Sequence, residues 1–435
     1  MPNDVGELQE VPTGWSLVSL AGLSSILSGG TPSKREPRYW QGDVPWVSGK
    51  DLKTPQLRDA IDHVSLDAIG SGTRIAPAGS VFLLVRGMGL ARDLPVAVAS
   101  RDMAFNQDIK ALVPNDLRLG PFIRAAIYHR RDRLLSRIVP SAHGTLTLNL
   151  DDVAGFQIPV PNNVTEAVAI GDALELIHNK QGATVVETST IEQLKLSVST
   201  ELFSRGLRGE AQRVTDIGRL PISWDVSTIG DVAVTTQYGL SVRGQAKGAY
   251  PLLRMNCQEA GRVHYRDLQF VDLDDPTFNT FRLERGDLLF NRTNSIEHVG
   301  RTAIVDDERP AVFASYLVRL RVEAQRCLPR FLNQFMNWPT TQLEIKKLAS
   351  RAVGQANINA SKLRTVRFPL PGLEEQREIV EILEAIDRKA ELARLKQRVL
   401  DDLFRALLHK LMIGEIRIAD LDLSALTNRA TQTAA

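Results

Sequence analysis

Residues 373–412 read LEEQREIVEILEAIDRKAELARLKQRVLDDLFRALLHKLM. Apolar side chains recur in this stretch at alternating spacings of three and four residues, and the residues between them are mostly charged. This spacing, kept over nearly five heptads, predicts a coiled-coil helix, which at about 1.5 Å per residue is roughly 60 Å long. The expected seam consists of Ile379, Leu383, Ile386, Ala390, Ala393, Leu400, Phe404, Leu407 and Leu411, with one polar position at Gln397. So long an apolar stripe requires a second helix to cover it.

A tandem internal repeat indicates where that second helix lies. VPTGW at residues 11–15 recurs as LPISW at residues 220–224, which is 209 residues later. The other matched segments are residues 77–83 with 284–290, 144–149 with 354–359, and 156–161 with 366–371. Each copy is a compact sequence followed by a long helical stretch, so the first long helix is expected at residues 165–205.

The first long helix has a weaker pattern than the second. Its middle, residues 178–190, reads HNKQGATVVETST and is rich in residues that form helices poorly. We expect a bend, a loosened turn or a break there. Antiparallel pairing of the two helices would relate the two halves of the chain by an approximate two-fold axis.

The predicted fold class is mixed α/β, with two tandem globular domains and two long antiparallel coiled-coil helices between them. Short β-branched runs predict strands at residues 80–85, 97–99, 109–113, 287–290 and 317–322. The expected segments are a first globular domain (1–161), a long helix (162–210), a second globular domain (211–371), a second long helix with a closing segment (372–418), and a disordered tail (419–435).

The composition, 43% hydrophobic and 24% charged, is that of a soluble globular protein. No apolar run approaches the roughly 20 residues of a membrane span, and the first residues lack the basic and apolar regions of a secretion signal. We therefore expect a cytoplasmic protein that does not contact membranes. Cys257 and Cys327 are isolated in the sequence, which favours buried free thiols over a disulfide or a zinc site.

The net charge of +2 is unevenly distributed. It is +1 over residues 1–161 (17 basic, 16 acidic) and +6 over 213–371 (22 basic, 16 acidic). It is −3 over 162–212 (4 basic, 7 acidic) and −2 over 372–435 (10 basic, 12 acidic). A positive surplus in the compact segments mildly favours a polyanionic partner.

Signatures of catalysis are missing from the sequence. Residues 87–92 begin like a dinucleotide-binding loop, but Arg92 stands where the third glycine belongs. The sequence has no methyltransferase tetrapeptide of the Asn/Asp-Pro-Pro-aromatic type, and its seven histidines lack metal-ligand spacing. We predict a chain that catalyses no reaction and binds no metal.

The chain resembles the specificity subunits of type I restriction-modification enzymes over about residues 11–418. The first half carries the resemblance at residues 28–33 (SGGTPS), 39–40 (YW) and 44–47 (VPWV). The second half carries it at residues 368–371 (FPLP), 373–380 (LEEQREIV) and 411–416 (LMIGEI). The halves depart from each other at residues 162–166, NNVTE in place of LEEQ, and at 237–241, QYGLS in place of the Gly-Gly-Thr-Pro signature.

This resemblance implies that each globular half is a target recognition domain for one part of a bipartite, asymmetric sequence in double-stranded DNA. The long helices would then set the spacer between the two parts. Two methyltransferase subunits would pack on this scaffold, and two motor-nuclease subunits would complete the enzyme. The resemblance also implies that S-adenosylmethionine, ATP and magnesium are bound by those partners and no cofactor by this chain.

Base recognition needs Arg, Asn or Gln side chains at loop tips, and phosphate contacts need Lys, Arg, Ser or Thr nearby. The candidates in the first half are Thr31, Ser33, Lys34, Arg35, Arg38, Ser48, Lys50, Arg86, Arg92, His143 and Thr145. The candidates in the second half are Gln237, Tyr238, Arg243, Arg254, Asn256, Arg292, Thr293, Asn294, Ser295, Gln355 and Asn357. Trp15, Trp46 and Trp224 are expected in the core. Two alternatives stay open, a specificity subunit of a methylation-only complex and a scaffold that binds protein.

Overall fold

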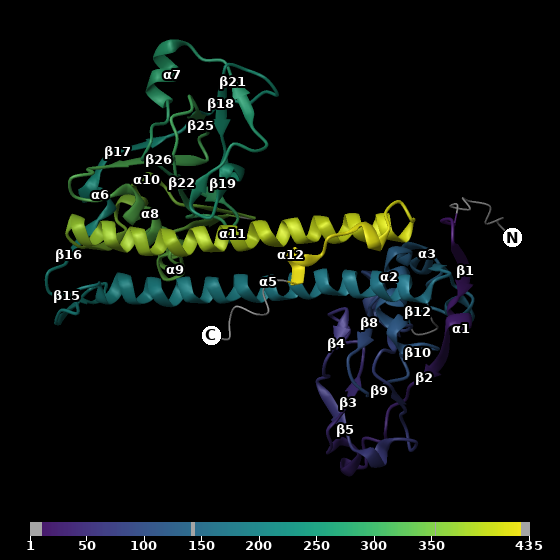
Figure 1. Ribbon diagram of the computed structural model, residues 1–435. Coiled ribbons are helices and arrows are strands. Elements are labelled where there is room, and N and C mark those ends of the chain that lie inside the picture. Colours follow the sequence, from purple (N-terminus) through teal and green to yellow (C-terminus); the bar gives the residue numbers. More distant parts are fainter. Residues whose placement is uncertain (1–10, 141–143, 353, 428–435) are drawn as a thin grey trace. The chain divides into compact units, whose positions relative to one another are not determined.

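The computed structural model describes residues 11–140, 144–352 and 354–427 (Figure 1). These residues divide into two compact units. Unit 1 comprises residues up to 186 together with those from 395 onward, and unit 2 comprises residues 187–394. Each unit therefore contains a globular part and a portion of both long helices. No helix in the described ranges has the length and hydropathy that a membrane crossing requires.

The two long helices are α5 (Val164–Arg205) and α11 (Leu373–Met412). The bounds of α11 match the expectation. Of the bend, loosened turn or break expected within residues 178–190 of α5, the break is wrong because the helix is continuous there. The hydroxyl of Thr184 donates to the carbonyl oxygen of Lys180 at 2.8 Å, one turn earlier. A threonine whose hydroxyl bonds to the carbonyl one turn earlier is accommodated inside a helix. Low helix propensity in this stretch therefore did not break α5.

Within each unit the helices run antiparallel. In unit 1, Ile170 and Ile177 of α5 share a core with Phe404 and Leu411 of α11, and Gln181 Nε2 donates to Asp401 Oδ1 at 2.8 Å. In unit 2, residues later in α5 meet residues earlier in α11. There, Ile191 packs on Ala390 and Ala393, Lys195 pairs with Asp387 at 2.6 Å, and Ile379 and Leu383 are fully buried. Each unit thus uses its own length of the predicted seam.

Unit 1 is built on a five-stranded sheet in the order β2-β10-β7-β8-β4. Its middle strand, β7, is buried along its whole length. Its strands are β2 (Ser24–Ser28), β10 (Ile109–Pro114), β7 (Val81–Leu84), β8 (Val96–Ala99) and β4 (Gln56–Leu57). A further sheet has the order β5 (Asp62–Val64), β3 (Val44–Val47), β9 (Met103–Phe105), β6 (Ile75–Ala76). Strand β1 (Trp15–Ser19) pairs with β13 (Gln157–Pro161), and β11 (Val139–Pro140) pairs with β12 (Leu146–Thr147).

The shorter helices of unit 1 are α1 (Leu20–Leu23), α2 (Gly120–His129), α3 (Arg131–Leu135), α4 (Leu150–Ala154) and α12 (Ser424–Thr427). Of these, α2 packs against β7 and β8. The 3-10 turns are η1 (Pro37–Trp40), η2 (Leu66–Ala68), η3 (Met88–Ala91), η4 (Leu117–Leu119) and η6 (Ile418–Asp420). The disordered tail expected over 419–435 is corrected in part, because Leu421 and Leu426 pack against the core of unit 1. Residues 428–435 lie outside the described ranges.

Unit 2 repeats this architecture with a sheet in the order β17-β26-β22-β24-β20-β19. Its strands are β17 (Ala233–Tyr238), β26 (Leu317–Val322), β22 (Leu288–Asn291), β24 (Thr302–Ile304), β20 (Arg262–Val263) and β19 (Gln258–Glu259). Smaller sheets are β21 (Gln269–Val271)-β18 (Tyr250–Leu253)-β25 (Val312–Phe313) and β23 (Thr293–Asn294)-β28 (Gln355–Asn357)-β27 (Ser350–Ala352). The paired strands β16 (Asp225–Thr228) with β29 (Arg367–Leu370) and β14 (Gln212–Thr215) with β15 (Gly218–Pro221) complete the sheets. Its shorter helices are α6 (Ile229–Val232), α7 (Asp275–Phe281), α8 (Pro329–Asn337), α9 (Pro339–Lys347), α10 (Ala360–Arg364) and η5 (Met255–Cys257).

The strand registers of the two units match. Ser16 lies opposite Val160 in the β1–β13 pair, and Asp225 lies opposite Leu370 in the β16–β29 pair, at offsets of 209 and 210 residues. The mixed α/β class, the tandem repeat and the five predicted strands are confirmed. Trp46, Trp224 and both cysteines are buried, while Trp15 is partly buried against the core of unit 1. The two-fold axis and the limits of the five segments stay predictions.

Candidate nucleic-acid interface

Several candidate side chains of unit 2 meet where β23 pairs with β28. Thr293 lies opposite Asn357, and Asn294 lies opposite the buried Ala356. The side-chain amide of Asn357 donates to the hydroxyl of Thr293 at 2.6 Å. Asn294 Nδ2 lies 3.2 Å from Met255 Sδ, which brings η5 and the neighbouring Asn256 to the same place. Segments from three parts of the chain thus converge on one polar cluster, which also includes Gln355 and Ser295.

Arg292 is held at the edge of this cluster. Its guanidinium carbon lies 4.7 Å from the centre of the Tyr238 ring, and Nη1 donates to the carbonyl oxygen of Ser315 at 3.1 Å. The Tyr238 hydroxyl accepts from the backbone N–H of Ala360 at 2.9 Å, which fixes the ring. Stacking and a carbonyl contact restrict the rotamers of Arg292 without neutralising its charge. A restricted, charged guanidinium is suited to bidentate contacts with guanine or phosphate.

Unit 1 has the same arrangement with different side chains. Arg86 follows β7 as Thr293 follows β22, and its backbone bridges to Thr147 of β12. The pair Arg86–Thr147 is therefore the counterpart of Thr293–Asn357, as the repeat predicts. Arg86 is exposed, and Thr145 precedes β12. Sequence reasoning missed Lys110, whose Nζ donates to Ser28 Oγ at 2.7 Å. Burial and the charge of Arg86 lower the pKa of Lys110, which indicates a locally positive field.

A pattern signal for Lys110 was available. It is the polar position between buried Ile109 and Ala111 in a predicted strand, so its side chain had to point out of the core. His143, in contrast, lies outside the described residues.

The glycine-rich stretch of unit 1 is a packing element on one side and an exposed loop on the other. A Cβ atom on Gly29 would clash with the carbonyl oxygens of Phe105 and Asn106, and one on Gly239 of unit 2 would clash with those of Phe313 and Ala314. The glycine thus recurs at the 210-residue offset because the strand beneath comes so close. The exposed part carries Thr31, Ser33, Lys34, Arg35 and Arg38.

Other candidates already have partners within the protein. Ser48 Oγ donates to Asp51 at 2.9 Å, and Lys50 Nζ contacts Asp62 at 2.8 Å; this hydrogen bond raises the pKa of Lys50. The side-chain oxygen of Gln237 accepts from the buried Arg319, so this amide stabilises the unit 2 sheet. Arg92 and Arg243 are exposed, and Arg254 Nη2 donates to the carbonyl oxygen of Asp267 at 3.2 Å.

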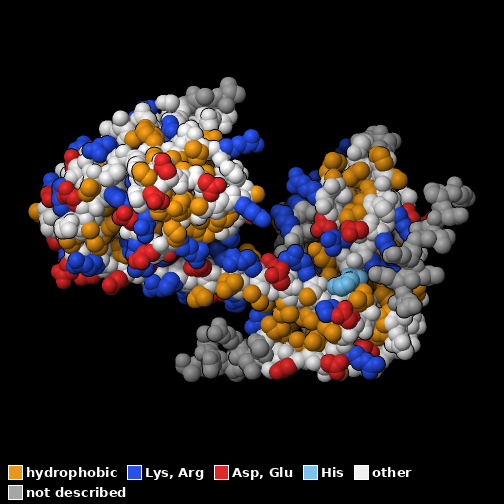
Figure 2. Space-filling model, turned by 90° about the horizontal axis from the view of Figure 1, so that it is seen from above, with side chains coloured by type: hydrophobic (Ala, Val, Ile, Leu, Met, Phe, Trp, Pro, Cys, Tyr) orange, Lys and Arg blue, Asp and Glu red, His pale blue; other side chains and the backbone are white. Residues whose placement is uncertain are grey.

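The surface charge is intermixed. On the face of each unit visible in Figure 2, Lys and Arg side chains are interleaved with acidic and apolar ones. The face seen in Figure 2 is therefore not uniformly basic. Within the described ranges, no group of three His, Cys, Asp or Glu side chains is arranged to hold a metal ion.

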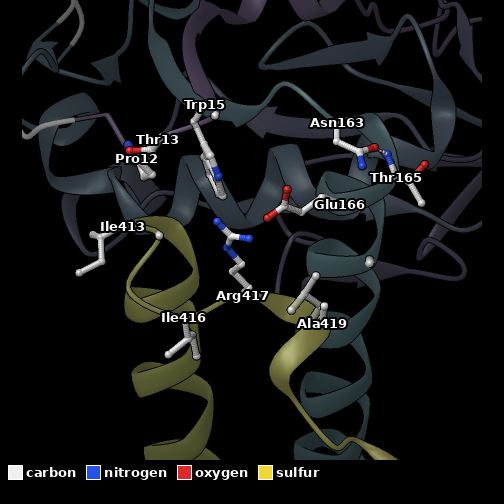
Figure 3. A pocket seen from close by; sticks show the side chains of 14 residues that line it. Pro12, Thr13, Trp15, Asn163, Thr165, Glu166, Ile413, Ile416, Arg417 and Ala419 are labelled. Carbon is white, nitrogen blue, oxygen red and sulfur yellow. Dashed lines mark hydrogen bonds between the residues drawn. The ribbon is translucent and has the colours of Figure 1, made fainter.

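The start of α5 in unit 1 borders a pocket of about 810 Å³ (Figure 3). Trp15 of β1, Glu166 of α5 and Arg417 after α11 point toward one another across it. In unit 2 the corresponding tryptophan is tied down, because Trp224 Nε1 donates to the buried carboxylate of Glu375 at 2.9 Å. That carboxylate also accepts from the backbone N–H of Leu207 at 2.7 Å.

Comparisons with known proteins agree on one class. Residues 221–400 match the family model described as the type I restriction modification DNA specificity domain. The chain is 31% identical over 176 residues to a putative type I restriction enzyme MjaX specificity subunit of Methanocaldococcus jannaschii, covering 40% of this chain and 41% of that relative's length. It is 22% identical over 404 residues to the EcoKI specificity subunit of Escherichia coli K12, covering 87% and 83%.

A solved structure agrees with the fold. The crystal structure of a type I restriction-modification S subunit from M. genitalium superposes with a TM-score of 0.62 at 13% identity, covering 93% of this chain and 98% of that one. At that identity the superposition establishes the common fold alone.

Proposed function

We propose that this chain, which belongs to the specificity subunits of type I restriction-modification systems, reads a bipartite DNA sequence with one half-site for each unit. Specificity subunits of this family are generally non-catalytic, and they bind DNA and assemble with other subunits. In this chain the globular part of each unit would enter the major groove. The antiparallel helix pair would fix the number of unread bases between the half-sites.

The observation that carries this proposal is the repeated polar cluster. Arg86–Thr147 in unit 1 and Thr293–Asn357 in unit 2 occupy the same position in the same topology but differ in side chain. A common frame with different side chains is what two domains need to read different bases. Cations held by carbonyl and ring contacts, such as Arg292, are suited to a defined rather than a diffuse contact.

The finer assignments belong to the same proposal. Two methyltransferase subunits and two motor-nuclease subunits would join this chain, and the long helices would provide the docking surface for the former. S-adenosylmethionine, ATP and magnesium would be used by those subunits. A complex that contains methyltransferase subunits alone could use the same specificity subunit.

The test measures which DNA sequences are methylated by the chain assembled with its methyltransferase subunits. We expect Arg292→Ala to relax one base position of one half-site, at a cost of about 1–3 kcal/mol, and Arg86→Ala to alter only the other half-site. Arg118→Ala is the control, since Arg118 is exposed and pairs with Asp116. It follows the last residue of β10, whereas Lys110 lies near the first.

Loss of binding to all sequences alike would assign Arg292 to phosphate instead of base contact. If neither variant changes the recognised bases of either half-site, the polar clusters do not make the base contacts. Binding to duplex DNA that is absent at every salt concentration would favour the protein-binding scaffold.

A further inference from the structure

Unit 1 contains a second pocket, of about 580 Å³, on the side of α2 that faces the two long helices. It is lined by Arg124 and Tyr128 of α2, His178 and Gln181 of α5, Phe404 of α11, and the loops at residues 52–55 and 93–96. All of these residues belong to unit 1. The polar cluster of the candidate interface contributes no side chain to it.

The central feature of this pocket is an unpaired buried cation. Arg124 is only 5% exposed, and its guanidinium makes no hydrogen bond or ion pair with any described residue. The acid that acts on it electrostatically, Glu175, is half-buried and accepts instead from Gln56 Nε2 at 2.6 Å. Burial lowers the pKa of Arg124 to about 10 and raises that of Glu175. Burying a charge without a partner is costly, so such a group normally has a ligand.

Two further groups can donate into the same pocket. His178 Nδ1 is buried and meets no atom with full hydrogen-bond geometry among the described residues, while hydrogen bonding with the Gln181 side chain acts to raise the pKa of this ring. A neutral ring with the proton on Nδ1 would serve as a donor. Lys53 is exposed at the rim, and no described side chain pairs with it.

The acids that line the pocket are already occupied. Asp401 accepts from Gln181 and Gln397 at 2.8 and 2.9 Å, and Asp93 pairs with Arg131 at 3.5 Å. One lining acceptor, Gln181 Oε1, is also buried without a hydrogen-bond partner, whereas Arg124, His178 Nδ1 and Lys53 are donors.

We propose that this pocket is a phosphate-binding site with Arg124 as its central ligand, His178 as a neutral donor and Lys53 at its rim. A phosphate group presents up to four oxygens to donors that approach from α2, α5 and the 52–55 loop. A carboxylate presents two oxygens in one plane and suits a single arginine fork better. The volume exceeds that of one ion and leaves room for the remainder of a phosphate-bearing molecule.

The first test is thermal unfolding of the full chain in about 20 mM phosphate against chloride of equal ionic strength. Binding to the folded state should raise the Tm by about 2 °C. Arg124→Met should remove that shift and, without phosphate, unfold no earlier than the wild type, because an unpaired buried charge is gone.

Lys53→Ala tests the rim on a residue whose truncation leaves the core intact, and it should reduce the shift by about half. Arg74→Ala is the control, because Arg74 is an exposed cation of unit 1 that belongs neither to the pocket nor to the candidate interface, and it should keep the full shift. The proposal would be overturned if phosphate did not raise the Tm of the wild type. It would also be overturned if Arg124→Met and Lys53→Ala both kept the full wild-type shift. If Arg124→Met does not fold, the Lys53→Ala comparison decides.

A second measurement distinguishes the two sources of phosphate. Where phosphate weakens duplex DNA binding by the wild type but not by Arg124→Met, the site takes a backbone phosphate. Where DNA binding is unchanged while the thermal shift persists, it takes a free phosphate-bearing molecule. Only this measurement rests on the proposed DNA-binding function, so failure of that function leaves the thermal test intact.

Discussion

In each unit a long helix begins after an equivalent strand pair, β1–β13 in unit 1 and β16–β29 in unit 2. Within the described residues, only the unit 2 junction has a carboxylate that accepts a hydrogen bond from its tryptophan. Trp224 follows LPIS and Trp15 follows VPTG at matched positions. In unit 2 Glu375 accepts hydrogen bonds from Trp224 Nε1 and from the backbone N–H of Leu207. In unit 1 the third residue of α5 is likewise a glutamate, Glu166, and it points toward Trp15 and Arg417 across the pocket (Figure 3), but Trp15 Nε1 has no hydrogen-bond partner within the described ranges. The same glutamate position therefore joins three segments in unit 2 and borders a pocket in unit 1.

This difference predicts that the two junctions open at different free-energy costs. The buried Glu375 joins the start of α11, the segment directly after α5 and the turn before β16 that carries Trp224. These three segments of unit 2 can separate only by leaving donors or the carboxylate unpaired. Pro12, Glu166 and Arg417 border the open counterpart in unit 1. The junction of unit 1 should therefore open at a lower free-energy cost than that of unit 2.

The largest effect is expected from breaking the closed joint. Glu375→Ala leaves Trp224 Nε1 and the Leu207 N–H buried without an acceptor, which should lower the free energy of unfolding of unit 2 by about 3 kcal/mol. Hydrogen exchange read separately on peptides of each unit would show the loss in unit 2 only. Glu374→Ala is the matched control, because the preceding glutamate is exposed. A loss below about 1 kcal/mol would mean that the lock contributes little.

A pH change should separate the two units next. Burial, followed by His409, lowers the pKa of His129 to about 4, and burial, followed by Arg124, lowers that of His178 to about 4. Both histidines lie in unit 1, whereas His264 and His298 of unit 2 are not buried. The unfolded chain binds protons near pH 6.5 and the folded unit only near pH 4, so unit 1 loses stability as the pH falls between these values.

The combined loss should be about 3 kcal/mol after allowance for partial exposure. Hydrogen exchange at pH 7 and pH 5 measures it, and His178→Phe should remove part of the difference while His298→Phe should not. Equal pH dependence in the two units would contradict this assignment.

The sequence predicted the elements of this fold better than their contacts. Heptad spacing gave the bounds of α11 because a strict apolar stripe leaves few alternatives, and the repeat placed Arg86 and Thr293 at equivalent positions. The continuity of α5 through Gly182 and Thr184 was missed, since tertiary packing overrides weak propensity. The engagement of Gln237 by Arg319 was also missed, because that arginine belongs to a strand 82 residues later in the sequence. Side-chain pairing between distant segments has no local signature, so interface residues were predicted only as clusters.

The smallest expected effect is the most specific, and it comes from closing the open joint. Glu166 is the carboxylate of unit 1 at the helical position of Glu375, and it points toward Trp15 and Arg417 across the pocket (Figure 3). Arg417→Ala removes the cation that faces this carboxylate, which should let Glu166 accept from Trp15 Nε1 and stabilise unit 1 by about 1 kcal/mol through one new hydrogen bond to a charged group. Indole N–H resonances report this directly: the Trp15 signal should shift and exchange more slowly, while that of Trp224 stays in place. Arg417→Ala combined with Glu166→Gln, where the acceptor is neutral, should give a smaller gain. An unchanged Trp15 resonance in Arg417→Ala would show that the two junctions differ in backbone geometry.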